Sequence, residues 1–403
     1  MFDKFCVLIL VLTACVAAEY NVLVVNDIHY SQRYNERSSR SSWCETSIPT
    51  AVAAPYGRYR CDAPMKLITS TLDAMVSVDP EPDLLIIGGD FGGHTALSLD
   101  EITQSIQAVT GEIKRRFPHT STFPVIGNDD VFPDYKLDAG QLNTLANIWA
   151  DWLSADELAT FKTGGYYKRE VSASLHVIVL NTLLVIPQNT MTSAATHQWT
   201  WFAAELAAST GAGARVVLVM HIPPGVNGYD QTDPWTTEDF DAFTAIVAQY
   251  SGVISGIYAF HEHTDLHRAF EGTFMLISPS VTPAFGNNPS FRTMCWDAQG
   301  GLADVIQFYL DLPRASIDGA AHFVKEYSMA EEYGQYMAGG RFSAQSAEAL
   351  QARSMSDGAF WTTYYNRMKA ENSASGRASF ACAMVVSDER AFSKCLQSFP
   401  FKN

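Results

Sequence analysis

Several apolar runs in the sequence are followed at once by side chains that can bind a metal ion. Asp27 and His29, at D-x-H spacing, follow the run NVLVV, and His261 and His263, at H-x-H spacing, follow GVISGIYAF. The same arrangement recurs after LLIIGG, FPVIG and RVVLVM, and the full set of predicted ligands is Asp27, His29, Asp90, Asn128, His221, His261 and His263. Binding sites of α/β sheets are built at the carboxyl ends of the strands. The pattern therefore predicts one metal centre assembled from several strand ends.

The chemistry of this set suits a dinuclear site. Imidazole and carboxylate ligands are typical of zinc, iron or manganese, and one carboxylate can bridge two cations. We expect Asp90 to be that bridge. Two cations about 3.5–4 Å apart can clamp a phosphate and generate hydroxide near neutral pH, which would attack phosphorus in line with the leaving group. The residues thus predict two divalent metal ions and hydrolysis of a phosphoester.

The elements that would position these residues alternate along the chain. Besides the runs above, strand composition is found at 175–180, 266–277 and 304–311. Helical periodicity lies at 64–78, 100–117, 138–153, 197–208 and 237–250, which indicates α/β layers. From about residue 319 the chain is richer in Ala, Ser, Tyr and Met and reads as helical. We predict a signal peptide at 1–18, a catalytic domain at 19–318 and a helical C-terminal extension at 319–403.

Composition and charge limit the class of protein. The chain has 403 residues, of which 47% are hydrophobic and 17% charged, as in a globular protein. A formal net charge of -16 argues against a nucleic acid polymer as partner and against electrostatic docking on anionic membranes. Lys4, the apolar run at 5–16 and the small residues Ala17 and Ala18 predict a secretory signal peptide, with an uncleaved anchor as the alternative.

The cysteines fit an oxidising compartment. Loss of the signal peptide would leave five of them, and the pairs close in sequence are Cys44 with Cys61 and Cys382 with Cys395. This pairing leaves Cys295 unpaired, although connectivity cannot be deduced from spacing alone.

The ordered series D-x-H, GGD, GN, strand-His and H-x-H resembles the calcineurin-like metallophosphoesterases. Four further segments resemble the acid sphingomyelinase branch of that family. They are His221-Ile222-Pro223-Pro224-Gly225, His94 four residues after Asp90, Cys61-Asp62-x-Pro64 after Cys44, and Gly164-Gly165-Tyr166-Tyr167. The resemblance spans about residues 21–310. It implies a four-layer fold, with two packed mixed β-sheets flanked by helices and a helical C-terminal extension.

The resemblance also implies a division of roles within a dinuclear site, for which zinc is the expected metal. One cation would be held by Asp27, His29, Asp90 and His263, and the other by Asp90, Asn128, His221 and His261. His94 would position or protonate the phosphoester.

Two departures from the family pattern bear on catalysis. The family has GNH followed by an acid, whereas this chain has Gly127-Asn128-Asp129-Asp130. Asp129 could donate a proton at acidic pH if its pKa were raised, but it cannot supply an imidazolium. The second departure is Phe260-His261-Glu262-His263 in place of G-H-T-H, where a phenylalanine could crowd a turn that glycine permits.

The sequence therefore predicts a secreted or endolysosomal metal-dependent phosphodiesterase. Sphingomyelin-like phospholipids, phosphocholine compounds and nucleotides all remain candidate substrates, with small soluble phosphodiesters slightly favoured and room left for transient membrane contact. The alternative is a metal-binding pseudoenzyme with a recognition role, because Asp129 replaces the usual histidine. Retention of the whole ligand set favours the enzyme. The sequence predicts no oligomeric state.

Overall fold

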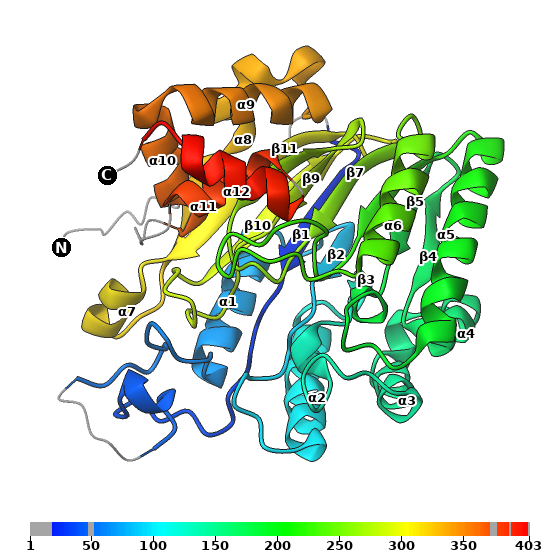
Figure 1. Cartoon of the computed structure of the whole chain (residues 1–403). Helices are drawn as coiled ribbons and strands as arrows, with labels where there is room; N and C mark the ends of the chain where they lie inside the picture. The colour runs from blue at the N-terminus through cyan, green and yellow to red at the C-terminus, as the bar shows by residue number, and fades with distance from the viewer. Residues whose placement is uncertain (1–17, 47–51, 371–376, 387, 402–403) are drawn as a thin grey trace, which may run out of the picture.

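Two six-stranded sheets form the centre of the molecule in the computed structural model, which describes residues 18–46, 52–370, 377–386 and 388–401 (Figure 1). The predicted signal peptide lies almost wholly outside these residues. The strand order is β12-β11-β10-β1-β2-β3 in the first sheet and β4-β5-β6-β7-β9-β8 in the second. The strands are β1 Tyr20–Val25, β2 Leu84–Ile87, β3 Ser121–Pro124, β4 Tyr167–Ser172, β5 Leu175–Val179, β6 Arg215–Val219, β7 Ile254–Ala259, β8 Leu266–Phe270, β9 Thr273–Ile277, β10 Ser290–Trp296, β11 Leu302–Leu310 and β12 Phe323–Ser328.

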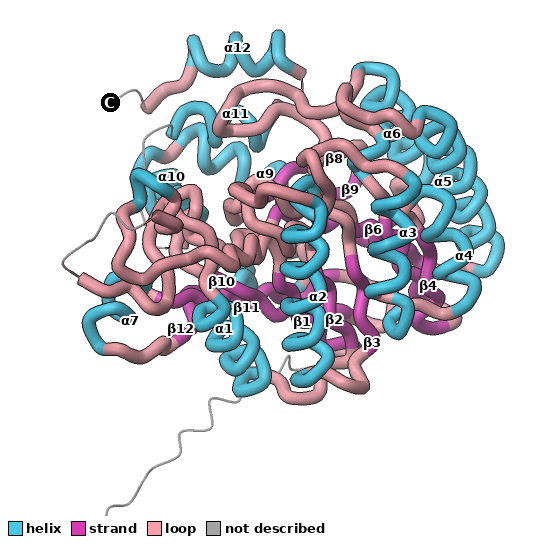
Figure 2. Tube along the Cα trace, turned by 90° about the horizontal axis from the view of Figure 1, so that it is seen from below, coloured by secondary structure: helices cyan, strands magenta, loops and turns pink. Residues whose placement is uncertain are grey.

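Helices cover the outer faces of both sheets, as Figures 1 and 2 show, which confirms the predicted four-layer arrangement. Helices α1 to α3 flank the first sheet, and α5 and α6 lie along the second. The helices are α1 Met65–Val78, α2 Leu99–Arg116, α3 Ala139–Ile148, α4 Ala155–Gly164, α5 Thr192–Ala212, α6 Thr237–Tyr250, α7 Leu312–Asp318, α8 Met329–Tyr333, α9 Ala344–Ser356, α10 Gly358–Met368, α11 Arg377–Val385 and α12 Glu389–Ser398. Within the described ranges, no helix is long and apolar enough to cross a bilayer.

The registers of the parallel strands place the ends of neighbouring strands side by side. Val25 pairs with Ile87, and Ile87 pairs with Pro124, so β1, β2 and β3 end at the same edge. In the second sheet, Val219 of β6 pairs with Tyr258 of β7. The core strands are buried on both faces, which explains their continuous apolar composition.

The C-terminal segment is mostly helical and packs against the second sheet. Helices α9 and α11 contact the edge strand β8, and α12 lies beside α11. Strand β12, just after the predicted boundary at residue 318, is the edge strand of the first sheet. The division of the chain at 318 stays a prediction.

The two local disulfides are present as predicted, joining Cys44 to Cys61 and Cys382 to Cys395. The expectation that Cys295 is unpaired is wrong, because this residue of β10 is also disulfide-bonded. Spacing in the sequence does not determine which cysteines pair.

Candidate metal centre

The predicted ligands of the first cation converge at the carboxyl ends of β1, β2 and β7. Asp27, His29 and Asp90 each place a ligand atom within 4.8 Å of the others, and all three are buried. His29 Nε2 lies 3.4 Å from Asp90 Oδ2. His263 Nε2 lies 3.2 Å from Asp27 Oδ1, which adds the fourth side chain. The four residues, from the three loops after β1, β2 and β7, therefore share one small volume.

The predicted ligands of the second cation lie around the other side of Asp90. Asp90, His221 and His261 form a second group of ligand atoms within 4.8 Å of one another. His221 Nε2 is 3.0 Å from Asp90 Oδ2 and 3.1 Å from Asn128 Oδ1. Asp90 thus belongs to both groups, which is the position that a bridging carboxylate requires.

The backbone is unusually bent at these ligands. Five of them have left-handed conformations, namely Asp27 with φ 47°, His29 with φ 45°, Asp90 with φ 56°, His261 with φ 67° and His263 with φ 51°. Such conformations cost L residues on the order of 1–3 kcal/mol each and cluster at functional sites. The loops after the strands are therefore strained in a way that turns several donors toward one point.

Two histidines are oriented by carbonyl groups of the loop after β2. Nδ1 of His29 lies 3.0 Å from the Gly92 carbonyl oxygen, and Nδ1 of His221 lies 2.7 Å from the Gly88 carbonyl oxygen. Each ring donates Nδ1–H outward and directs Nε2 to the centre, as is usual for metal-binding histidines. Asp27 Oδ1 and His29 Nε2 are buried without a hydrogen-bond partner among the described residues. Buried polar atoms are seldom unpaired, so the donor set fits bound cations.

Asp130 ties together the loops after β2 and β3, a role that its place in the sequence did not reveal. Its Oδ2 accepts hydrogen bonds from the amides of Asp90, at 3.0 Å, and Gly127, at 2.8 Å, while Oδ1 accepts from Phe91 at 2.7 Å. Burial and the charge of Asp90 raise the pKa of Asp130 to about 7. The two loops also approach closely, since a Cβ at Gly127 would lie 2.2 Å from Asp90 Oδ1.

Asp129, which replaces the family's histidine, orients the neighbouring amide. Its Oδ2 accepts a hydrogen bond from Asn128 Nδ2 at 2.9 Å, so that Asn128 Oδ1 faces His221. The same Oδ2 lies 4.0 Å from His94 Nε2. Burial, reinforced by the charge of Asp90, raises the pKa of Asp129 well above its usual value. The carboxyl group thus lies in the site and fixes which atom of Asn128 points at the cations.

His94 is held by Asp62, a second residue whose role the sequence did not reveal. His94 Nδ1 is 2.7 Å from Asp62 Oδ1, and its backbone amide donates to Asp62 Oδ2 at 2.8 Å. The ring stacks on His29 with 3.8 Å between centroids. Burial favours the neutral ring, but the charges of Asp62, Asp129 and Asp90 raise the pKa of His94 to about 10.

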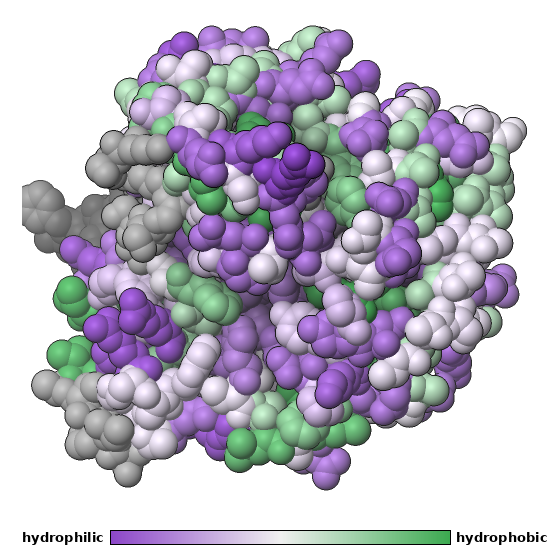
Figure 3. Space-filling model, in the orientation of Figure 1, coloured by the Kyte–Doolittle hydropathy of each residue, from purple (hydrophilic) through white to green (hydrophobic). Residues whose placement is uncertain are grey.

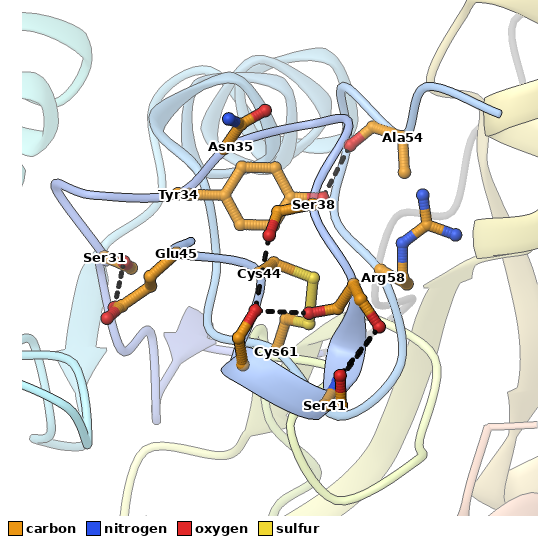
Figure 4. The surroundings of a disulfide bond; sticks show 12 residues. Ser31, Tyr34, Asn35, Ser38, Ser41, Cys44, Glu45, Ala54, Arg58 and Cys61 are labelled. Carbon is orange, nitrogen blue, oxygen red and sulfur yellow. Dashed lines mark hydrogen bonds between the residues drawn. A yellow bond between two sulfur atoms is a disulfide. The ribbon is translucent and has the colours of Figure 1, made fainter. Parts of the chain in front are cut away.

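A disulfide fixes the segment that carries Asp62. Cys61 precedes Asp62 and is bonded to Cys44, in a loop that also contains the hydrogen bond from Ser31 Oγ to Glu45 (Figure 4). Trp43, next to Cys44, lies 5.5 Å from His94 between ring centroids. The disulfide therefore anchors both the residue that orients His94 and an aromatic neighbour of that ring.

Phe260 does not crowd the turn that precedes His261. It is fully buried and is not among the residues with positive φ. Its ring fills space that Gly88 leaves open, because a Cβ at Gly88 would lie 2.4 Å from Phe260 Cγ. The departure from the G-H-T-H pattern is thus accommodated by a glycine on another strand end.

A cavity of about 290 Å³ opens onto the centre. Figure 3 shows a hollow lined by hydrophilic side chains near the middle of this face. The loop between β6 and α6 lies at the same place in Figure 1. Besides His94, Asp129 and several of the predicted ligands, the cavity is lined by Asp134, Tyr135, Asn227, Tyr229, Asp230 and Phe285. A larger hollow of about 950 Å³, lined by residues such as Thr122 and Trp201, contains none of the predicted ligands. The chemistry therefore belongs to the smaller cavity.

Comparison with known proteins identifies the family of the chain. Residues 20–256 match the family described as calcineurin-like phosphoesterase. The chain therefore belongs to the calcineurin-like phosphoesterases, enzymes that use divalent metals. Its relatives place it more narrowly among the acid sphingomyelinase-like phosphodiesterases.

Three curated relatives illustrate this placement. Acid sphingomyelinase-like phosphodiesterase 3b of Homo sapiens is 29% identical, covering 92% of this chain and 89% of that protein. Sphingomyelinase phosphodiesterase C of Dictyostelium discoideum is 31% identical, covering 77% of this chain and 78% of that protein. Cyclic GMP-AMP phosphodiesterase SMPDL3A of Bos taurus is 28% identical, covering 77% and 75%.

Among solved structures, a dimetal phosphatase from Danio rerio matches with a TM-score of 0.48 and 11% identity, covering 72% of this chain and 95% of that chain. The family and the relatives support an enzyme, and the pseudoenzyme alternative gains no support over it. The disulfides fit a secreted protein.

Proposed function

We propose that the chain hydrolyses phosphodiesters such as phosphocholine compounds and sphingomyelin. In these substrates the alcohol that stays on the phosphate after hydrolysis is choline, which carries a quaternary ammonium. The composition of the cavity carries this proposal. Beyond the metal centre it has two further carboxylates, Asp134 and Asp230, and the aromatic residues Tyr135, Tyr229 and Phe285, with no lysine or arginine among its described lining residues. Aromatic faces and carboxylates attract a quaternary ammonium, whereas additional phosphate groups would be repelled.

A nucleotide diester is the second candidate, and a specific pair of residues favours it. Tyr229 and Phe285 are 38% and 44% exposed, and their ring centroids lie 5.7 Å apart at the cavity. Exposed aromatic rings can stack on a nucleobase. Some relatives are named cyclic GMP-AMP phosphodiesterases, and others sphingomyelinase phosphodiesterases, so the relatives support both candidates.

We assign the predicted ligands to two cations, with zinc as the expected metal because the donors are imidazole nitrogens and carboxylate or amide oxygens. Asp27, His29, Asp90 and His263 would hold one, and Asp90, Asn128, His221 and His261 the other. When bound, such cations polarise the phosphoryl group and lower the pKa of a water molecule. The chain itself contributes the orientation of Nε2 of His29 and His221 through the Gly92 and Gly88 carbonyls.

His94 is proposed as the proton donor to the leaving group. Asp62 occupies its Nδ1, which leaves Nε2 free beside the cavity, and the charge of Asp62 favours the protonated ring by raising its pKa. Asp129, beside His94, is proposed to hold Asn128 in place and to take part in proton transfer. This arrangement gives the site a histidine donor despite the missing GNH histidine.

The disulfides and the predicted signal peptide further support action outside the cell or in an acidic endolysosomal lumen.

A pair of chromogenic substrates with the same leaving group tests the proposal. Zinc-reconstituted protein would be assayed with p-nitrophenyl phosphorylcholine and with thymidine 5'-(p-nitrophenyl phosphate), with Asp90→Asn as the control. We expect kcat/KM to be at least about tenfold higher for the choline ester, and both activities to be lost in the control. A higher value for the thymidine ester would favour the nucleotide candidate. Turnover of neither ester by protein with two bound zinc ions would refute the phosphodiesterase proposal for these classes.

A further inference from the structure

A buried ion pair lies inside the H-x-H segment. Glu262, between His261 and His263, accepts a hydrogen bond through Oε1 from Arg268 Nη2 at 2.6 Å. Their side chains are only 1% and 4% exposed. Glu262 stands where the family pattern has threonine, so the pair is a feature of this chain. Burying two charges is costly, and apolar replacements of such pairs are often as stable. Stability alone therefore does not account for it.

Arg268 also contacts the loop that follows β6. Its Nη1 donates to the Pro224 carbonyl oxygen at 2.7 Å, and its Nη2 donates to the Val226 carbonyl oxygen at 3.1 Å. This loop contains His221, two residues after the end of β6. One planar guanidinium on β8 thus joins the loop of His221 to the segment of His261, and only arginine offers such a fork.

The loop after β6 also packs against the C-terminal helices, on the side away from Arg268. Val226 belongs to a small cluster of buried residues with Cys382, Ala383 and Phe392 of α11 and α12. Because that cluster fixes the outer surface of the loop, the inner contact through Arg268 decides how far the loop lies from the H-x-H segment.

We propose that Arg268 and Glu262 are positioning residues that set the distance between the imidazoles of His221 and His261, and through it the affinity of one cation. The inference rests on the dinuclear site of the proposed function. The two rings are 5.2 Å apart between centroids. Metal–ligand distances tolerate only about 0.2 Å of change, so a small displacement of either loop weakens binding.

Arg268→Lys is the informative variant, because it keeps the charge that balances Glu262 and removes the fork. Arg169→Lys is the matched control. Arg169, on β4, is 15% exposed against 4% for Arg268, and it likewise bonds a carboxylate, Glu157 at 2.6 Å, and two carbonyl groups. Its partners lie near β3 and α4, away from the predicted ligands. The probe is zinc, titrated into the metal-free full-length protein in a competing chelator, with the zinc content counted by elemental analysis.

We expect Arg268→Lys to bind one of two zinc ions about 10–100-fold more weakly, and Arg169→Lys to bind both within about twofold of wild type. Wild-type affinity in Arg268→Lys, or an equal loss in both variants, would overturn the proposal. If Arg268→Lys does not fold, Glu262→Thr decides by the same criterion, because it frees the H-x-H segment while Arg268 keeps its carbonyl partners. A wild type that binds two zinc ions without hydrolysing either ester defeats the proposed function and leaves this inference standing.

Discussion

Lys369 makes a prediction about stability and pH that can be worked out from its surroundings. It follows α10, is 1% exposed, and its Nζ has no hydrogen-bond partner among the described residues. Nζ lies 4.0 Å from the centroid of Tyr229 and 5.3 Å from that of Phe380. The amine is therefore enclosed by aromatic rings behind a wall of the cavity.

Burial lowers the pKa of Lys369 from 10.5 to about 7. Because one pKa unit corresponds to about 1.4 kcal/mol, burying the charged amine costs about 5 kcal/mol. This cost is the net preference of the buried site for the neutral amine, with the attraction of the two rings already included. Below pH 7 the amine is charged in both the folded and the unfolded chain, so the whole cost opposes folding. Between pH 7 and 10.5 the folded chain releases the proton first, so this contribution to stability improves as the pH rises.

Lys369→Met removes the charge and retains the length of the side chain. We expect the free energy of unfolding to increase by about 5 kcal/mol at about pH 5.5, and by only about 1.4 kcal/mol at about pH 9.5. Urea unfolding with intact disulfides measures both values. Lys66→Met is the control, since Lys66 lies 4.5 Å from the centroid of Tyr56 but is exposed, and it should change stability little at either pH. An equal effect of Lys369→Met at the two pH values would refute the reasoning.

Three further substitutions probe the site. Gly127→Ala should abolish cation binding and lower activity by about 100-fold or more, because the added methyl group would collide with Asp90 Oδ1. Zinc content and turnover measure these losses, and a fully active variant would contradict the close approach of the two loops. Asp62→Asn should lower kcat about 10–100-fold with unchanged zinc content, because His94 loses its charged partner; an unchanged kcat would exclude His94 as proton donor. Phe285→Ala should raise KM for the choline ester about tenfold with little change in kcat, and unchanged KM would remove this ring from substrate binding.

The convergence of the ligands could be predicted because two regularities of the sequence combine. The apolar runs are continuous where strands are buried on both faces, as in β1 and β2. The polar residues then stand directly after each run, and the parallel registers bring the strand ends together. Asp27 and Asp90 could therefore be placed at one edge of the first sheet, and His221 and His261 at one edge of the second, without knowledge of the loops.

Elements with mixed composition were predicted less well. The stretch 266–277 was read as strand-like, and the structure divides it into β8 and β9 at Glu271 and Gly272, both of which have positive φ. Strands β4 and β12 carry charged residues because each lies at the edge of its sheet, and they were not predicted. Asp62 and Asp130 were not assigned roles because a carboxylate that orients other groups looks the same in sequence as any acidic loop residue.

The two replacements in the H-x-H segment, Phe260 and Glu262, have a common explanation in their spatial partners. Phe260 alone predicts a crowded turn, but the space for its ring is provided by Gly88, far away in the sequence. Glu262 alone predicts a buried charge beside two ligands, but Arg268 neutralises it and also donates from Nη1 and Nη2 to carbonyl groups of a second loop. Each replacement is thus one half of a contact between the H-x-H segment and another element of the fold. A substitution that breaks only one partner should therefore harm the cation site more than the exchange of both, because the loops are positioned by the contact and not by either residue alone.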